Sequence, residues 1–109
     1  MSRAEDQQGY RYNLNKQKEV TGTTYTMLAE DNQGTIIFNN ATGITVTVNN
    51  DLPDNFTCNF YNYGAGTVVF TEGTAVFDDP EGASLLTKKV AALDKFIDNN
   101  IYILKGELE

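Results

Sequence analysis

The chain has 109 residues, enough for one domain, and 40% of them are apolar, so a single modest hydrophobic core is expected. The net charge of −7, from eight basic and fifteen acidic residues, argues against binding to nucleic acid or to an anionic membrane surface through clustered Lys and Arg. The absence of His and the single Cys exclude Ser-His and Cys-His nucleophile pairs and an internal disulfide.

Residues 1–20 are mostly polar and are predicted to form an extended N-terminal arm, followed by a β domain over residues 21–109. Within this arm Tyr10, Tyr12 and Leu14 alternate with polar residues, so they share one side of an extended backbone. Such a segment can lie along a sheet edge or in a groove of a partner, and a disordered tail is the other reading. We expect the arm to anchor the domain through these three residues. The N-terminus lacks the apolar region of a secretory signal peptide, and no apolar stretch approaches the length of a membrane span.

From Thr21 onward, short runs rich in β-branched and aromatic residues alternate with turn residues. The runs are TGTTYTML, TIIFNN, ITVTVNN, FTCNFYNY, TVVFTE and TAVFDD, and the segments between them contain Asn, Asp, Gly and Pro. Short strands separated by such turns predict an all-β fold, a small antiparallel sandwich or barrel of about seven to nine short strands.

Two of these runs, ITVTVNN and FTCNFYNY, have one apolar side and one polar side, and the role of the polar side needs an explanation. Cys58, between Phe56 and Phe60, is predicted to be a small buried hydrophobe. The polar sides of the two strands define a candidate oligomer or ligand face, which consists of Thr45, Thr47, Thr57, Asn59, Tyr61 and Tyr63. Such side chains are compatible with a contact to another subunit, with a plain solvated face, or with stacking on a sugar.

The segment 84–98 permits two interpretations. Leu86, Val90, Leu93 and Ile97 have helical spacing, which predicts an amphipathic helix. The alternative is a pair of strands, followed by a turn at Asn99-Asn100 that leads into a last strand.

The sequence contains no catalytic signature. Its acidic turns, around Asp31 and at Asp78-Asp79, lack the ligand spacing of a calcium-binding loop. We therefore predict no catalytic residue, no metal site and no cofactor, and we expect the protein not to be an enzyme. A glycan-cleaving enzyme with an unrecognised pair of carboxylates is the competing interpretation.

Five runs, taken in order, resemble a module that recurs in virion proteins of tailed bacteriophages. They are TGTTYT (21–26), FNNA (38–41), ITVTV (44–48), GAGTVVF (64–70) and ILKGEL (103–108). The resemblance covers residues 21–108 and extends to tail-fibre, collar and head-fibre proteins. It implies a small all-β domain in trimeric fibres or surface-attached assemblies, structural or adhesive rather than catalytic, and it favours strands over residues 84–98.

This sequence departs from that pattern in three ways. Asn49-Asn50 stand where proline usually follows the ITVTV strand, Tyr102 stands where the last strand usually has Trp, and a long fibre shaft is missing.

These observations together predict a non-enzymatic virion structural protein, made in the host cytoplasm. It would be a short head or tail fibre or a capsid decoration protein, a homotrimer attached to other virion proteins by its arm. The alternative is a receptor-binding tip domain that recognises host surface glycans. The sequence leaves open the head or tail location, the host and the receptor.

Overall fold

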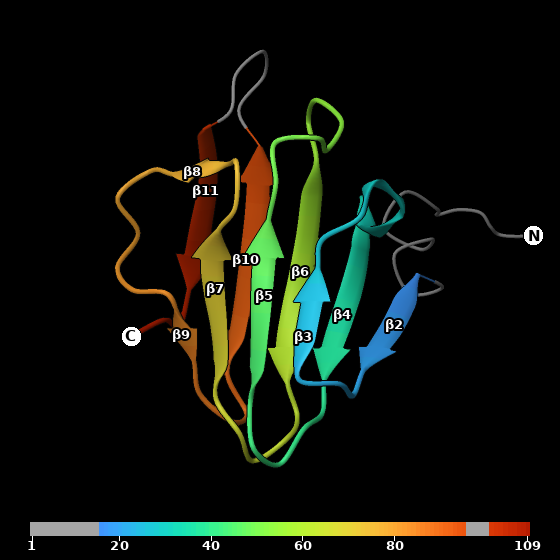
Figure 1. Cartoon of the computed structure of the whole chain (residues 1–109), viewed down its shortest axis with the longest axis vertical. Coiled ribbons are helices and arrows are strands. Elements are labelled where there is room, and N and C mark those ends of the chain that lie inside the picture. Colours follow the sequence, from blue (N-terminus) through green and yellow to red (C-terminus); the bar gives the residue numbers. More distant parts are fainter. Residues whose placement is uncertain (1–15, 96–100) are drawn as a thin grey trace, which may run out of the picture.

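The computed structural model describes residues 16–95 and 101–109, and these residues form ten strands and one short 3-10 helix. Figure 1 shows the elements in chain order, which are β2 (Gln17–Val20), β3 (Thr24–Thr26), η2 (Ala29–Asp31), β4 (Gly34–Phe38), β5 (Ile44–Val48), β6 (Thr57–Asn62), β7 (Val68–Glu72), β8 (Val76–Phe77), β9 (Ser84–Leu85), β10 (Val90–Lys95) and β11 (Ile101–Gly106). The prediction of an all-β fold is confirmed.

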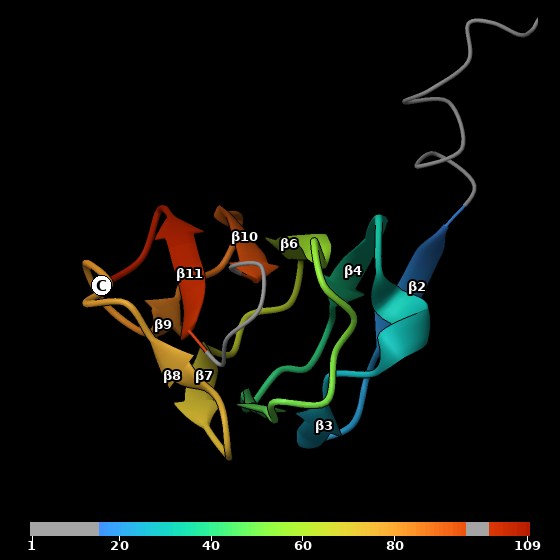
Figure 2. The same ribbon diagram turned by 90° about the horizontal axis from the view of Figure 1, so that it is seen from above.

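The strands form two sheets that face each other across the core (Figure 2). The larger sheet has the order β2-β4-β6-β10-β11-β8, and the smaller has the order β3-β5-β7-β9. Along each strand buried and exposed residues alternate, as in ITVTV of β5, where Ile44, Val46 and Val48 are buried. Each sheet therefore has one face toward the core and one outer face.

The prediction of an antiparallel sandwich or barrel was wrong, because most neighbouring strands of the first half run parallel. The chain passes from one sheet to the other after each strand, so that β2, β4 and β6 pair in parallel, as do β3, β5 and β7. The path is a coil typical of a β-solenoid. Alternation predicts that a strand has one buried face, but it does not say which strand is its neighbour. Loops that are short enough for hairpins instead cross to the opposite sheet.

The last part of the chain closes the coil with antiparallel strands. β10 lies between β6 and β11, antiparallel to both, and β9 pairs antiparallel with β7. Residues 84–95 thus contain strands β9 and β10. The alternative prediction of a helix over residues 84–98 was therefore wrong for residues 84–95, the part of that segment that the structure describes. The predicted turn at Asn99-Asn100 lies outside the described residues.

Strand β2 (Gln17–Val20) comprises the last four residues of the segment that we expected to form the arm. It pairs with β4 along its whole length, from Gln17 opposite Thr35 to Val20 opposite Phe38. The sheet therefore begins before Thr21. The candidate anchoring residues Tyr10, Tyr12 and Leu14 lie outside the described residues.

Aromatic side chains from both sheets meet in the core. The ring centroid of Phe60 lies 4.9 Å from that of Phe70 and 5.7 Å from that of Phe38, and all three residues are buried. Phe38 and Phe60 belong to the larger sheet and Phe70 to the smaller, so the cluster joins the two layers. Tyr102, at the place of the expected Trp, is fully buried.

At one corner of the coil the β4–β5 turn lies directly on the β6–β7 turn. A Cβ atom on Gly66 would lie 2.2 Å from the backbone nitrogen of Gly43, so only glycine fits there. Asn40 joins the neighbouring turns, because its Nδ2 donates to the carbonyl oxygen of Thr21 at 2.9 Å and its own carbonyl oxygen accepts from the nitrogen of Gly66 at 2.9 Å. These contacts hold consecutive coils in register.

Candidate functional site

The larger sheet has an open depression on its outer face, over β4, β6, β10 and β11. Its volume of about 570 Å³ lies within the usual range of ligand sites, roughly 300–1,000 Å³. We call it the outer depression. Side chains of six residues border it, namely Thr35, Asn59, Tyr61, Val90, Ala92 and Lys105.

The outer depression arises from small residues in the middle of the sheet. The strand register places Ala92 between Asn59 on β6 and Lys105 on β11. Ala92 has a single-carbon side chain, whereas both neighbours in this row have long ones. Gly106, with φ +127° and no side chain, borders the same space. The hollow is therefore shaped by the sequence of β10 and β11.

Among the described residues, Lys105 has the one ammonium group that borders the outer depression, and an ion pair fixes it. The Nζ atom of Lys105 lies 2.8 Å from Oδ2 of Asp94, and the hydroxyl group of Thr57 donates to Oδ1 of Asp94 at 2.6 Å. The carboxylate thus compensates the positive charge of Lys105. Because Lys105 is exposed and Asp94 is partly exposed, the contribution of this pair to stability is small, about 0–1 kcal/mol.

Three polar side chains around the outer depression have unused hydrogen-bonding capacity. Within the part of the chain that the structure describes, the hydroxyl groups of Thr35 and Tyr61 and the amide group of Asn59 make no side-chain hydrogen bond. Polar groups at the rim of an apolar hollow are the usual composition of a binding site for a small molecule.

The structure brings together only some of the residues that the sequence predicted for one face. Thr57, Asn59 and Tyr61 all lie on the outer face of the larger sheet. Tyr63 follows the end of β6, is 54% exposed, and its ring holds the Nζ atom of Lys88 at 3.8 Å from the centroid. Tyr63 therefore lies near the outer depression without bordering it.

Thr45 and Thr47 lie on the opposite side of the molecule, on the outer face of the smaller sheet. The strand pairing places them in two rows, which are Thr24–Thr45–Val69–Ser84 and Thr26–Thr47–Thr71. This face thus consists of short side chains that carry hydroxyl and methyl groups, and we call it the threonine face. The hydroxyl oxygens of Thr47 and Thr71 are 3.3 Å apart.

Several residues of the outer depression were not predicted from the sequence. Ala92 and Lys105 lie in the segments that were assigned to an ambiguous helix and to the last strand, and Thr35 lies in a strand that gave no functional signal. The positions come together only through the order β4-β6-β10-β11. On the outer face of β10 the small Ala92 lies between Val90 and Asp94, and this was the only local sign of a hollow.

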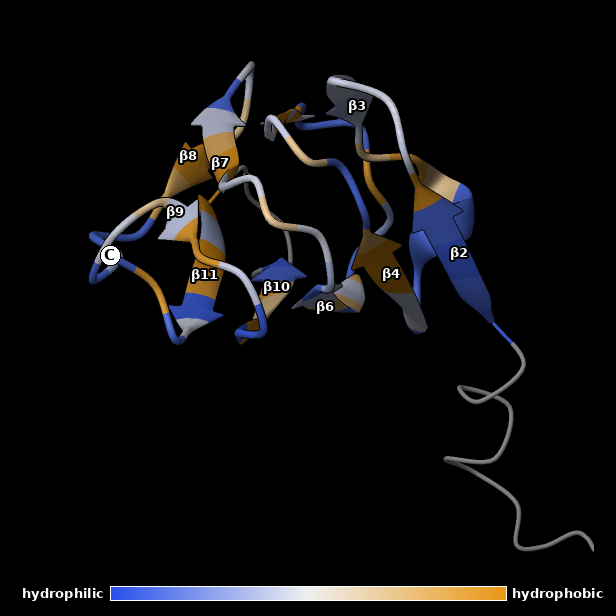
Figure 3. Cartoon of the chain, turned by 90° about the horizontal axis from the view of Figure 1, so that it is seen from below, coloured by the Kyte–Doolittle hydropathy of each residue, from blue (hydrophilic) through white to orange (hydrophobic). Residues whose placement is uncertain are grey.

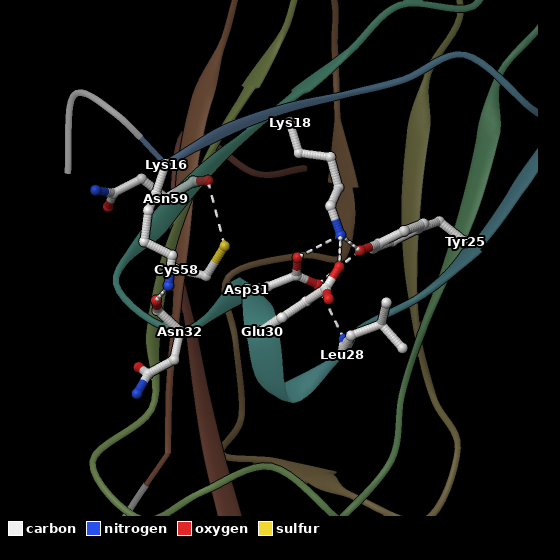
Figure 4. A network of polar contacts seen from close by, with 9 residues as sticks. All are labelled: Lys16, Lys18, Tyr25, Leu28, Glu30, Asp31, Asn32, Cys58 and Asn59. Carbon is white, nitrogen blue, oxygen red and sulfur yellow. Dashed lines mark hydrogen bonds and ion pairs between the residues drawn. The ribbon is translucent and has the colours of Figure 1, made fainter. Parts of the chain in front are cut away.

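A second cluster of polar side chains lies at the open edge of the coil, between β2 and β3 (Figure 4). Asp31 of η2 is buried, and its carboxylate accepts from Nζ of Lys18 at 2.8 Å, from the hydroxyl of Tyr25 at 2.6 Å and from the backbone nitrogen of Leu28 at 2.9 Å. Lys18 also pairs with Glu30 at 2.9 Å. In Figure 2 the η2 turn lies beside β2 at this edge.

The electrostatics of this cluster indicate a structural role. Burial raises the pKa of Tyr25 to about 12, and the hydrogen bond to Asp31 acts in the same direction. Burial opposes the charge of Lys18, but the hydrogen bonds of its ammonium group, first that to Asp31, outweigh burial and raise its pKa. Neither group can serve as a general base near neutral pH, because both hold their protons. The cluster closes the core edge with satisfied polar contacts.

Cys58 is buried and unpaired, as predicted. Burial raises the pKa of its thiol to about 12, and the negative charge of Asp31 contributes to the shift. The reactive thiolate is thus disfavoured, and Cys58 acts as a core side chain.

The described residues contain no group of three or more His, Cys, Asp or Glu side chains that could hold a metal ion. In the same part of the chain no helix has the length and apolar character needed to cross a membrane.

Comparisons with protein-family models, with curated proteins and with solved structures find no match to this chain.

Proposed function

We propose that this chain is a non-enzymatic structural protein of a bacteriophage virion, a short head or tail fibre or a capsid decoration protein. In this proposal it forms a homotrimer and is attached to other virion proteins by residues 1–15, with Tyr10, Tyr12 and Leu14 in contact with the partner. The resemblance of residues 21–108 to virion modules is one support for this role.

The observation that carries the proposal is the threonine face. Its rows span parallel strands of the smaller sheet, and several of its members are exposed, among them Thr45 and, at 36%, Val69. Threonine offers a hydroxyl group for hydrogen bonds and a methyl group for packing. Contacts between subunits outside their apolar centres have a similar mixed composition. A sheet face of this composition supports self-association better than it supports binding of a small molecule.

The coil architecture also favours a structural role. Successive coils lie on each other with glycine and asparagine contacts at the corner, as at Gly66 and Asn40. The polar cluster around Asp31 is fully occupied by contacts within the fold. Coils that are held to each other by such contacts are suited to mechanical attachment.

Incorporation into particles tests the proposal. A phage that encodes the chain without residues 1–15 should produce particles that lack this protein, as measured by quantitative mass spectrometry of purified virions. The deletion stops before Lys16, because the backbone nitrogen of Thr35 donates to the carbonyl oxygen of Lys16 and β2 begins at Gln17. If the full-length protein itself is not found in particles, the virion role is wrong.

A matched pair of variants tests the anchoring residues. Replacement of Tyr10, Tyr12 and Leu14 by Ser should reduce incorporation strongly. Replacement of the intervening Arg11 and Asn13 should have little effect under this proposal, which assigns the contact to the three apolar side chains. Normal incorporation of the first variant would show that these three residues are not the anchor.

A further inference from the structure

We propose that the outer depression binds one sugar unit of an uncharged glycan, with Tyr61 as the stacking surface and with Asn59 and Thr35 as hydrogen-bonding groups. This inference goes beyond the structural role proposed above, which requires no ligand. Sugar binding would let the protein adhere to a glycan in addition to being attached to the virion.

The shape of the outer depression favours a ligand that tolerates water on one side. The hollow lies on an open sheet face, with a floor made by Ala92 and by backbone near Gly106. A fully apolar ligand needs most of its surface buried, roughly 70–90%, which an open hollow does not provide. A sugar ring has an apolar C–H face that can lie on such a floor, while its outward hydroxyl groups stay hydrated.

The polar groups at the rim match the edge of a sugar ring. Asn59 offers an amide that donates and accepts, and Thr35 and Tyr61 offer hydroxyl groups, with no competing side-chain partner within the described ranges. Thr35 and Asn59 are direct neighbours in the strand register, so their groups lie on the same side of the hollow. Tyr61, two residues after Asn59 on β6, has its ring on the same outer face.

The charges around the outer depression favour a neutral ligand. Lys105 is paired with Asp94 at 2.8 Å, and a further carboxylate, that of Glu107, lies next to Val90, whose backbone nitrogen donates to it at 2.9 Å. The whole chain has a net charge of −7. Among the described residues that border the outer depression, the one cation is Lys105, which is already paired with Asp94, so an anionic glycan would meet carboxylates at the rim and should bind more weakly.

Titration of the ¹⁵N-labelled full-length chain tests this inference. The probes are four neutral hexasaccharides, namely maltohexaose, cellohexaose, mannohexaose and chitohexaose, with a sulfated heparin hexasaccharide as the anionic comparison. At least one neutral probe should cause saturable shifts in the amide signals of Asn59, Ala92 and Gly106, and the sulfated probe should not. Absence of saturable shifts with all four neutral probes would overturn the proposal.

Three variants separate the outer depression from the rest of the surface. Tyr61→Ala should weaken binding about tenfold through loss of stacking. Ala92→Leu should abolish binding by filling the hollow, and since this side chain points outward the fold should persist. The control is Tyr63→Ala, because Tyr63 does not border the hollow, and binding should change less than about twofold.

Two results would contradict the assignment even if shifts occur. Equal loss of binding in Tyr63→Ala and Tyr61→Ala would place the ligand elsewhere. Changes in the amide signals of this face that depend on the protein concentration, and not on the sugar concentration, would indicate a contact between copies of the chain. The virion role is measured separately, by particle content, so its failure and the failure of sugar binding can be distinguished.

Discussion

Lys18 has an unusual position for a charged residue, because its side chain points toward the core from the edge strand β2. It alternates with the exposed Gln17 and Glu19, and its ammonium group reaches the buried carboxylate of Asp31 at 2.8 Å. Figure 3 shows β2 mostly in blue, beside the apolar residues of β4. An inward-pointing charge on an edge strand hinders pairing with a strand of another chain. Lys18 therefore both neutralises Asp31 and protects the open edge.

We predict that Lys18→Met lowers the free energy of unfolding by about 2–3 kcal/mol, because the buried carboxylate of Asp31 loses its charged partner. The matched control is Lys89→Met, since Lys89 is exposed and its side chain makes no hydrogen bond or ion pair with the described residues. Urea unfolding followed by circular dichroism measures both variants. Equal effects of the two substitutions would show that the Lys18–Asp31 contact does not stabilise the fold.

The buried thiol of Cys58 predicts a loss of stability at alkaline pH. Burial raises its pKa from an ordinary 9.0 to about 12, so the folded state binds this proton more tightly than the unfolded state. The free energy of unfolding should thus fall as pH rises from about 9 toward 12, by up to about 1.4 kcal/mol per pH unit. The raised pKa of Tyr25 acts in the same direction above pH 10.

Urea unfolding at several pH values between 8 and 10.5 measures this dependence. Cys58→Ala should show a flatter decline over the lower part of the range, because Tyr25 does not yet titrate there. The same pH dependence in both proteins would show that the thiol is not responsible.

At the residue scale, the alternation of apolar and polar residues within a strand predicted which side chains are buried. The contacts between strands could not be predicted from it. The sequence correctly predicted that Phe56, Cys58 and Phe60 are buried. For Ala92 it offered only the small side chain itself as a sign of a hollow, and it did not predict that Lys18 points inward, because both facts depend on neighbours that are far away in the chain.

The coil is a property of the elements that the sequence did not reveal. The paired positions Gln17, Thr35 and Asn59 follow one another along the larger sheet, but they are unequally spaced in the chain, so no fixed repeat is visible. Parallel pairing usually needs a long crossover connection, and here a strand of the opposite sheet serves as that crossover. The strands themselves were predicted well, because each has one buried face.

The corner of the coil provides a test of this arrangement. We predict that Gly66→Ala lowers the free energy of unfolding by more than about 2 kcal/mol, because the new Cβ would lie 2.2 Å from the backbone of Gly43 and the stacked turns would have to separate. Gly22→Ala is the control, since the nearest atom to its Cβ would be 3.9 Å away. The free energy of unfolding of Gly22→Ala should differ from that of the wild type by no more than about 1 kcal/mol. The alanine fits without a clash, and its unfolded chain has less conformational entropy to lose on folding than the glycine chain has.

Thermal and urea unfolding of both glycine variants decide the point. A Gly66→Ala protein as stable as Gly22→Ala would mean that the two turns are not in contact.

At the scale of the whole molecule, the two outer faces have different chemistry. The threonine face consists of short side chains, whereas the outer face of the larger sheet has a hollow bordered by Tyr61, Asn59 and Lys105. The sequence grouped the polar residues of β5 and β6 as one candidate face, but consecutive strands of a coil belong to opposite sheets. Self-association and ligand binding can therefore use opposite sides of the molecule without competition.

This separation leads to a prediction about oligomeric state. The wild-type chain at micromolar concentration should have a mass in solution three times that of the monomer, measured by light scattering after size exclusion. Thr45→Glu places a carboxylate in the centre of the threonine face, so three copies would bring like charges together and the trimer should dissociate. Asn59→Glu is the control on the opposite face, and it should leave the trimer intact. Both positions are exposed, so both variants should fold, as far-ultraviolet circular dichroism can verify. A monomeric wild-type protein would contradict the trimer, and dissociation of Asn59→Glu alone would place the contact on the larger sheet, where it would cover the hollow.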